Sequence, residues 1–334
     1  MVGIRYKGQV FQNCFESIEW SGSIKTSARI LEVSYLKDKA LFELGEKVEF
    51  IIDNAILFVG KIFTISQDTE NETYTMKAYD NAIMLNKNSF IENYYNQTPS
   101  QIAKNILGQL GISSGQFPPD KTQCTFPAID KTGYDIILTA YKLQNAKDGV
   151  VYSIISENEK ISVVEQGIFI PGIALSSSKN IRQANYSKTI ENMVNKVIIY
   201  ESTKPIATKE NVEDKLKYGI FQKVQEQDTN NEVYLQINRL LKGVEENSDL
   251  TVDGNIYLMS GYSVAIKVKE FSRLNAAFLI ASDRHIWSNG DYVTYISLAF
   301  ENVMNDVDLV KASKREEYKK TNFNPWDAGV EINE

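Results

Sequence analysis

Hydrophobic and polar residues alternate along the stretch from Trp20 to Asp80, and turn-forming residues separate the alternating runs. Leu31, Val33 and Tyr35 fall on one side of an extended chain, with polar residues between them. The same two-residue period recurs in runs at 48–52, 60–65 and 74–78. This period is typical of half-buried strands. Several short strands with turns at near-regular spacing predict a small barrel or sandwich.

Residues 98–111 carry a different pattern, in which hydrophobic side chains recur about every four positions. Thr98 is suited to cap the helix N-terminus, Pro99 fits the first turn, and Gln101 completes a capping box. Gly111 follows the last periodic residue and favours the end of the helix. These features predict an amphipathic helix.

The remaining chain mixes helix and strand patterns. Thr132 is expected to cap a second helix, and a hairpin with strands at 150–156 and 161–165 should follow it. A Ser-rich stretch at 176–178 then ends this α/β segment. A further helix is predicted over 231–242. The strands predicted after residue 190 lie at 196–200, 218–224, 255–258, 262–268, 278–286 and 291–300.

The two strand-rich regions resemble each other loosely. Each contains a strand that follows a glycine, Gly45 in the first and Gly261 in the second, and each ends in a hairpin. The sequence is compatible both with a divergent internal duplication and with unrelated halves. Residues 305–334 are predicted to form an extended tail. Trp326 in this tail is either a docking peptide that orders on a partner or an incidental aromatic residue.

Composition narrows the function classes. The 334 residues are 43% hydrophobic and 24% charged, as in ordinary globular proteins, and the net charge of -7 disfavours a general nucleic-acid binder. No secretory signal and no membrane-spanning run is recognised, so assembly in a cytoplasm is expected. The two cysteines, Cys14 and Cys124, are expected to be buried or half-buried free thiols.

The chemical inventory is small. His285 is the one histidine and lies within a strand pattern, so a strand-surface or packing role is favoured over that of a catalytic base. No Gly-rich phosphate loop occurs. A pair of carboxylates for glycoside cleavage is compatible with the 43 acidic residues, but so large a number gives a pair no weight. We therefore assign no catalytic, cofactor-binding or metal-binding residues and expect a protein that is not an enzyme.

Several segments, taken in order, resemble the baseplate hub proteins of contractile injection systems, nearest the PBSX-like prophage hub and late control D proteins. The matching segments are Ile18–Gly22, Ser27–Val33, Gly45–Val48, Leu57–Lys61, Ala78–Asp80, Tyr218–Val224, Gly261, Val264, Ile266, Asp283–His285 and Asn289–Thr294. The resemblance covers residues 15–300 and leaves the C-terminal tail outside it.

The resemblance implies an α+β, mainly β fold in which two tail-tube-like β-barrel domains flank an α/β insertion. The expected divisions are 1–90 for the first barrel, 91–185 for the insertion, 186–304 for the second barrel and 305–334 for the tail. It also implies a homotrimer whose six barrels form a pseudo-hexameric ring, joining a six-fold tail tube to a three-fold spike. Such a ring would pair strand edges between subunits.

The implied partners are other copies of the chain, the tail tube protein, the central spike protein, a LysM-type tube–baseplate adaptor and baseplate wedge proteins, with the tape measure protein as a further candidate. No membrane and no sequence-specific nucleic acid is expected among them. The implied location is the baseplate of a phage tail or phage-tail-like bacteriocin assembled in the bacterial cytoplasm. The alternatives are a tail-associated cell-wall hydrolase and, suggested only by aromatic content, a receptor- or carbohydrate-binding module.

Overall fold

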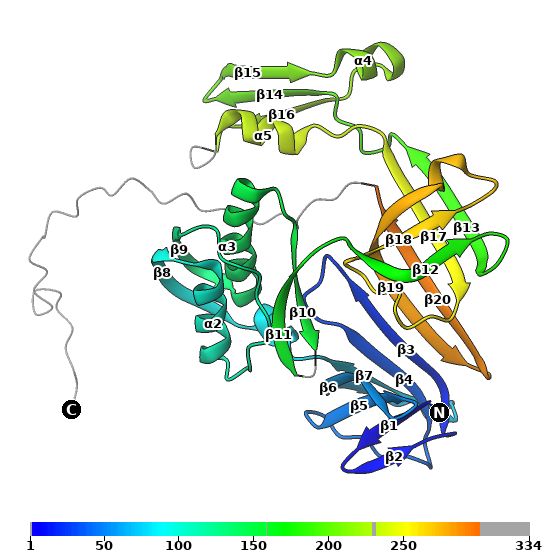
Figure 1. Ribbon diagram of the computed structural model, residues 1–334. Coiled ribbons are helices and arrows are strands. Elements are labelled where there is room, and N and C mark those ends of the chain that lie inside the picture. The colour runs from blue at the N-terminus through cyan, green and yellow to red at the C-terminus, as the bar shows by residue number, and fades with distance from the viewer. Residues whose placement is uncertain (1, 158, 229–231, 301–334) are drawn as a thin grey trace, which may run out of the picture.

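The computed structural model describes residues 2–157, 159–228 and 232–300, and strands dominate it (Figure 1). One large sheet runs in the order β13-β17-β20-β19-β3-β4-β7-β6-β5-β1-β2, with β18 paired to β19 and β12 paired to β18. The prediction of a mainly β, α+β fold is confirmed. Within the described ranges the sheet remains open, so the two-barrel arrangement stays a prediction.

The N-terminal strand unit comprises β1–β7 and confirms the meander predicted for residues 20–80. Leu31, Val33 and Tyr35 are buried on one face of β4, as their alternation requires. They pack with residues of the neighbouring strands into one hydrophobic core. The strands span Val2–Tyr6, Gln9–Phe11, Phe15–Ser23, Ile30–Leu36, Lys47–Ile52, Ala55–Ser66 and Thr73–Tyr79.

The C-terminal strand unit comprises β12, β13 and β17–β20, around its own core. The last three predicted strands are confirmed, but the strand predicted at 255–258 is wrong. Those residues form a turn in which the Leu258 N–H donates to the Asn255 carbonyl. The strands span Ile168–Ser176, Ile181–Thr189, Glu245–Asp253, Tyr262–Lys267, Ala276–Ser288 and Asp291–Ala299.

The two strand units share one strand order. The path β3-β4-β7-β6-β5-β1 in the first corresponds to β13-β17-β20-β19-β18-β12 in the second. Only the final pair differs, because β1 and β5 are antiparallel whereas β12 and β18 are parallel. The common order favours an internal duplication over unrelated halves.

Details of the backbone repeat as well. Gly45 and Gly261 both adopt positive φ, 80° and 92°, and lie two residues before β5 and one residue before β18. Their N–H groups donate to the carbonyls of Ile62 and Ile280 at 2.8 and 2.9 Å. Each acceptor lies beside a bulge, in β6 opposite β7 and in β19 opposite β20. Bulges that recur at equivalent positions are designed features of a fold rather than accidents.

The chain between the two units forms a segment of helices and short strands, which lies on the left in Figure 1. The predicted first helix is confirmed as α2, where Thr98 and Gln101 form the capping box. The second is α3, which Thr132 caps, and the predicted hairpin is β10–β11. The elements are α1 (Ile83–Lys87), β8 (Ser89–Gln97), α2 (Pro99–Gln109), β9 (Cys124–Thr132), α3 (Gly133–Asp148), β10 (Tyr152–Glu157) and β11 (Lys160–Glu165).

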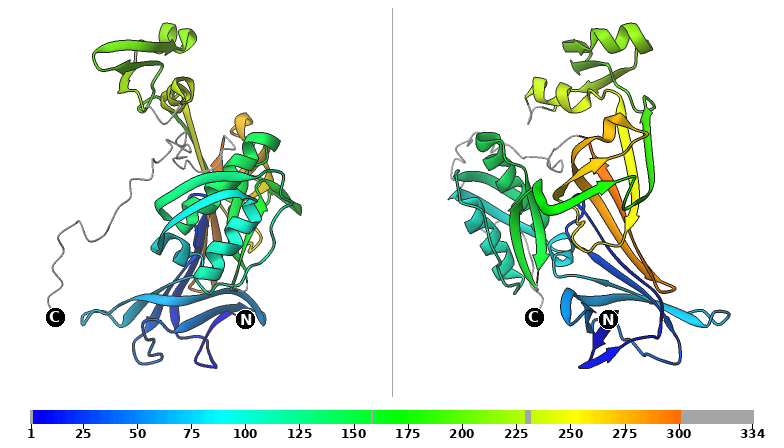
Figure 2. Two further views of the ribbon diagram at one scale, coloured as in Figure 1. Left: turned by 90° about the vertical axis from the view of Figure 1, so that its left-hand side faces the viewer. Right: turned by 45° about the vertical axis from the view of Figure 1, so that its right-hand side comes forward.

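A small three-stranded sheet protrudes at the top of Figure 1 and is again visible in both views of Figure 2. Its core is formed by Val197, Ile199 and Ile237. The strand predicted at 218–224 is partly wrong, since α4 includes Tyr218 and the strand starts at Gln222. The elements are β14 (Lys196–Glu201), β15 (Lys204–Glu210), α4 (Val212–Tyr218), β16 (Gln222–Glu226) and α5 (Val233–Leu240).

The domain boundaries predicted at residues 90, 185 and 304 stay a prediction. Strand β12 and the first half of β13 precede residue 185 and pair with β18 and β17 of the C-terminal strand unit. The predicted tail and Trp326 lie outside the described residues. Among the described helices, none is both long and apolar enough to cross a membrane.

Candidate functional site

The two strand units meet where β3 pairs with β19, in the right half of Figure 1. The ladder is antiparallel and runs from Ser23 opposite Ser282 to Ser17 opposite Ser288. Trp20 lies opposite His285, and both side chains are buried. Because the joint is a backbone ladder, the two units are parts of one sheet. The side chains described below all pack on or next to this β3–β19 junction.

An ion pair reinforces the junction. Arg29, just before β4, donates to both carboxylate oxygens of Asp283 on β19, with Nη1 3.0 Å from Oδ1. Asp283 also accepts the Ser260 backbone N–H at 2.6 Å. Burial alone would raise the pKa of Asp283, but the Arg29 charge and the contact with His285 outweigh it and hold that pKa below its usual range. Asp283 is therefore ionised at neutral pH.

Aromatic rings cover this ion pair. The Arg29 guanidinium lies 4.0 Å from the centre of the Trp20 ring, and Trp20 in turn lies 5.1 Å from His285. A desolvated cation over a Trp face is the strongest kind of cation–π contact. The ring of Trp287 stacks on Tyr292 at 4.2 Å and extends the cluster along the sheet.

His285 is fully buried within this cluster, so the packing role is confirmed and the strand-surface role is wrong. Its Nε2 lies 3.2 Å from Asp283, and its Nδ1 lies 2.8 Å from the Tyr292 hydroxyl. Burial lowers the pKa of His285, although Asp283 opposes the shift. The ring is therefore neutral at neutral pH and cannot serve an exposed substrate.

Asp80 anchors the other side of Arg29. Its carboxylate accepts the backbone N–H of Arg29 at 3.1 Å and that of Ala82 at 2.9 Å, which ties the end of β7 to the start of α1. Burial raises the pKa of Asp80 to about 7, and the two backbone donors limit the shift. Asp80 thus titrates near neutral pH inside the protein.

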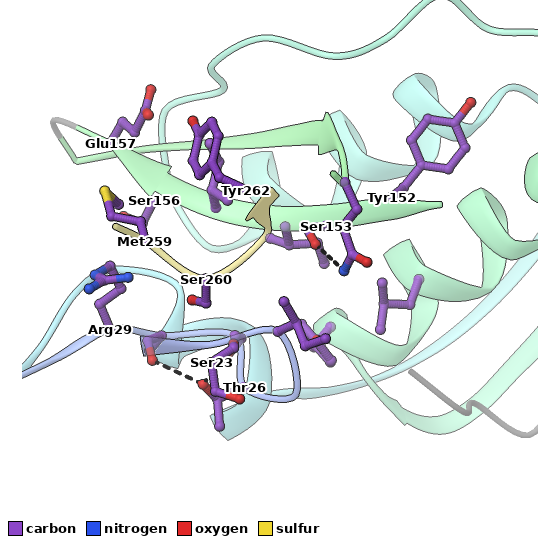
Figure 3. A pocket seen from close by; sticks show the side chains of 18 residues that line it. Ser23, Thr26, Arg29, Tyr152, Ser153, Ser156, Glu157, Met259, Ser260 and Tyr262 are labelled. Carbon is purple, nitrogen blue, oxygen red and sulfur yellow. Dashed lines mark hydrogen bonds between the residues drawn. The ribbon is translucent and has the colours of Figure 1, made fainter. Parts of the chain in front are cut away.

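The cavities near the junction differ in size. The one drawn in Figure 3, between the β3–β4 connection, the β10–β11 hairpin and the segment before β18, has a volume of about 50 Å³. That volume suits a few water molecules rather than a substrate. An open groove of about 560 Å³ follows one sheet face across the junction. Its polar lining includes Ser21, Gln183, Asn185, Asp249, Thr251, Arg284 and Ser297.

A family model described as YQBQ-like matches residues 18–299, which include both strand units and the junction. The chain belongs to the YQBQ-like family. It is 25% identical over 308 residues to the phage-like element PBSX protein XkdQ of Bacillus subtilis, covering 86% of this chain and 93% of that protein.

Solved structures share the fold of this YQBQ-like chain. The 43 kDa tail protein of prophage MuSo2 from Shewanella oneidensis gives a TM-score of 0.69 at 15% identity, covering 89% of this chain and 97% of that one. An Escherichia coli component of the type VI secretion system gives a TM-score of 0.56 at 13% identity, covering 90% of this chain and 78% of that one. The latter is described as structurally similar to the T4 bacteriophage tail proteins gp27 and gp5. The fold is thus that of phage tail proteins.

The described residues of this YQBQ-like chain offer little reactive chemistry. No group of three or more His, Cys, Asp or Glu side chains within them is placed to hold a metal ion. Cys14 and Cys124 are buried free thiols, as predicted, and burial raises the pKa of Cys124 to about 11. The buried carboxylates Asp80 and Asp283 are engaged by backbone and Arg29 donors. Such an arrangement stabilises a joint between strand units.

The sequence contained one signal for this site. Arg29, Asp80 and Asp283 all lie in segments that carry the family resemblance, although no spacing rule connected them. His285 was singled out and is a member of the cluster. The structure brings Arg29 and Asp283 together across a separation of 254 residues.

Proposed function

We propose that this chain is the structural hub of a contractile injection system's baseplate, in a phage tail or a phage-tail-like bacteriocin. In this proposal three copies form a ring that joins a six-fold tail tube to a three-fold spike. The observation that supports it most is the duplication, in which two units of equal strand order are fused in one sheet. Family membership and the tail-protein fold agree with it.

The duplication offers a physical solution to a symmetry mismatch. A six-fold tube presents six equivalent surfaces, whereas a three-fold spike presents three. A chain with two similar units can contact two tube subunits, so three copies match six. Each strand unit is then a tube-like barrel domain completed by its neighbours. The first corresponds to the division 1–90, and the second takes β12 and the first half of β13 from the division 91–185 in addition to strands of the division 186–304. Residues 305–334 would form the tail.

The partners follow from this arrangement. The tail tube protein and a LysM-type tube–baseplate adaptor would meet the ring on one side, and the central spike protein on the other. The insertion and the protruding β14–β16 sheet would face the baseplate wedge proteins, since both project from the strand units in Figure 2. The tape measure protein is a further candidate partner. Assembly would take place in the bacterial cytoplasm and end in the particle's baseplate.

Native mass spectrometry tests this proposal, on the full chain alone and after co-expression with its tail tube protein. We expect a trimer in at least one of the two samples and, by cryo-electron microscopy, a ring of six similar units. A chain that stays monomeric in both samples would overturn the proposal. A zymogram on peptidoglycan tests the hydrolase alternative, for which a lytic band that requires this chain would be the decisive result.

A further inference from the structure

The large sheet ends at β13, an edge strand that pairs with β17 alone in the described part of the chain. A second edge lies on β6. Residues 55–61 of that strand pair with β5, but Thr64, Ile65 and Ser66 continue beyond β5 and, among the described residues, pair with β7 alone. Unpaired strand edges expose a row of N–H and carbonyl groups that readily pair with another chain.

The duplication shows which edges belong together. Strand β19 corresponds to β6, and it too continues past its partner β18, whose pairing with it ends at Leu279. Its extension, residues 282–288, is paired with β3. Strand β3 corresponds in turn to β13. The β3–β19 pairing within the chain therefore has a counterpart, the pairing of β13 with the extension of β6. The described part of a single chain leaves both of these edges unpaired.

The register of this counterpart follows from the bulges. The residue after the bulge is Thr64 in β6 and Ser282 in β19, so these positions are equivalent. A bulge at Phe15/Ser17 in β3 has its equivalent at Ile181/Gln183 in β13. Counting from these marks makes Ser23 equivalent to Thr189 and Ser21 equivalent to Ser187.

We infer that β13 of one copy pairs antiparallel with residues 64–66 of a second copy of this chain, with Thr189 opposite Thr64 and Ser187 opposite Ser66. This inference rests on the proposed ring and assigns the strands and the register that would close it. Eight strands, from β6 through β3 and β19 to β13, form a continuous arc in one chain. Three such arcs joined at these edges would form one closed cylinder.

The shape of the β6–β7 hairpin agrees with this partner. Continuing the antiparallel register brings the turn over 67–72 alongside the Arg182 end of β13. Arg182 is already bonded to Asp253 and Asp291, and Lys188 to Glu246, all within the C-terminal strand unit, so the pairing rests on strand order and register rather than on charge. The β6–β7 hairpin also projects from the body of the molecule in Figure 2, and Thr64 and Ser66 are exposed.

The joint between copies lacks the ion pair of the joint within the chain. Ile65 occupies the position of Asp283, and the same counting places Glu246 at the position of Arg29. Glu246 instead binds Arg273 at 2.7 Å and the Tyr186 hydroxyl at 2.6 Å, both within its own unit. The joint between copies thus depends on the backbone ladder, so it should dissociate more readily than the joint within the chain.

Disulfide trapping tests the register on the full-length protein. Residues directly opposite on antiparallel strands have Cβ atoms about 4.5–5.5 Å apart, against about 7–8 Å for diagonal neighbours, so an opposite pair oxidises more readily. Ser66→Cys combined with Ser187→Cys should give non-reducing bands at two and three times the chain mass. The matched control is Ser66→Cys with Asn185→Cys, which shifts the register by two residues on the same exposed face.

Five further samples complete the design. A mixture of the two single variants should link, while neither single variant should link alone, which shows that the bond joins different copies. Ser23→Cys with Ser282→Cys, the paired residues of the internal joint, should give an intrachain bond without dimers. The unmodified chain reports any background from Cys14 and Cys124, which are buried.

The outcomes separate this inference from the proposed function. A trimer in native mass spectrometry with strong Ser66–Ser187 linkage and weak Ser66–Asn185 linkage supports both. A trimer in which the two pairs link equally, or not at all, overturns the strand pairing and leaves the trimer intact. A monomer with and without tube protein overturns the ring and the pairing together.

Discussion

The Arg29 guanidinium donates to both carboxylate oxygens of Asp283 and thereby joins the two strand units of one chain. The side chain of Asp283 is 0% exposed and that of Arg29 is 14% exposed. A buried pair of this kind costs much when one partner is removed, because the other charge stays buried without compensation. The stability of the joint should therefore depend on this pair.

Asp283→Asn should lower the free energy of unfolding by about 3–5 kcal/mol, since Arg29 loses its counter-charge in the buried junction. Urea denaturation followed by circular dichroism measures the change. Asp291→Asn is the matched control, because Asp291 also accepts two bonds from an arginine, Arg182, but with side chains 56% and 39% exposed. It should cost at most about 1 kcal/mol. Equal losses in the two variants would contradict the assigned role of the buried pair.

Asp80 should make stability depend on pH. Its pKa is about 7 in the folded protein against an ordinary value of 3.8, so the folded state binds this proton more tightly than the unfolded chain. The stabilisation from this proton is complete below the ordinary value and is lost as pH rises through about 7. The unfolding free energy of the natural protein relative to Asp80→Asn should therefore fall across that interval. Parallel pH curves for the two proteins would refute this.

Gly45→Ala and Gly261→Ala should each destabilise the protein by about 1–2 kcal/mol, because both glycines adopt positive φ, which an L-residue disfavours. No neighbouring atom crowds an added methyl at either position, so the cost should come from the backbone conformation alone. Similar losses are expected, since the two positions are equivalent in the two units. Gly108→Ala within α2 is the control and should stabilise by about 0.5–1 kcal/mol, as an added methyl there is unobstructed. Thermal unfolding measures all three variants, and a neutral Gly45 or Gly261 variant would count against the equivalence.

The thiols of Cys14 and Cys124 should react with DTNB only after unfolding. Both are buried, and burial raises their pKa values, so the reactive thiolate is scarce in the native protein. Absorbance should show two reactive thiols per chain in concentrated guanidinium chloride and a much slower reaction without it. Fast reaction of the native protein would show that one of them is accessible.

Local signals predicted the elements that form from neighbouring residues. The capping box at Thr98 and Gln101 predicted α2, and the strand patterns at 278–286 and 291–300 predicted the β19–β20 hairpin. The strands β13 and β17 were not predicted because their sequences, IRQANYSKT and EENSDLTVD, are mostly polar. They pair with each other and leave one face to the open groove, so few positions needed an apolar side chain.

The junction could not be predicted from spacing. Trp20 and His285 were both visible in strand patterns, yet neither pattern specifies the strand that will lie alongside. Pairing between β3 and β19 is set by the tertiary fold, and the Arg29–Asp283 pair depends on that pairing. The family resemblance marked the segments that contain Arg29 and Asp283, but it predicted no contact between these two residues.

The ladder between β3 and β19 also fixes the distance between the two strand units. Neighbouring strands lie about 4.8 Å apart wherever they pair, so the spacing between the two units equals the spacing inside each unit. No linker that could stretch or swivel separates them at this joint. In a ring of three copies, half of the joints would already be at their final distance before any two copies met, and only the other half would have to be found by collision.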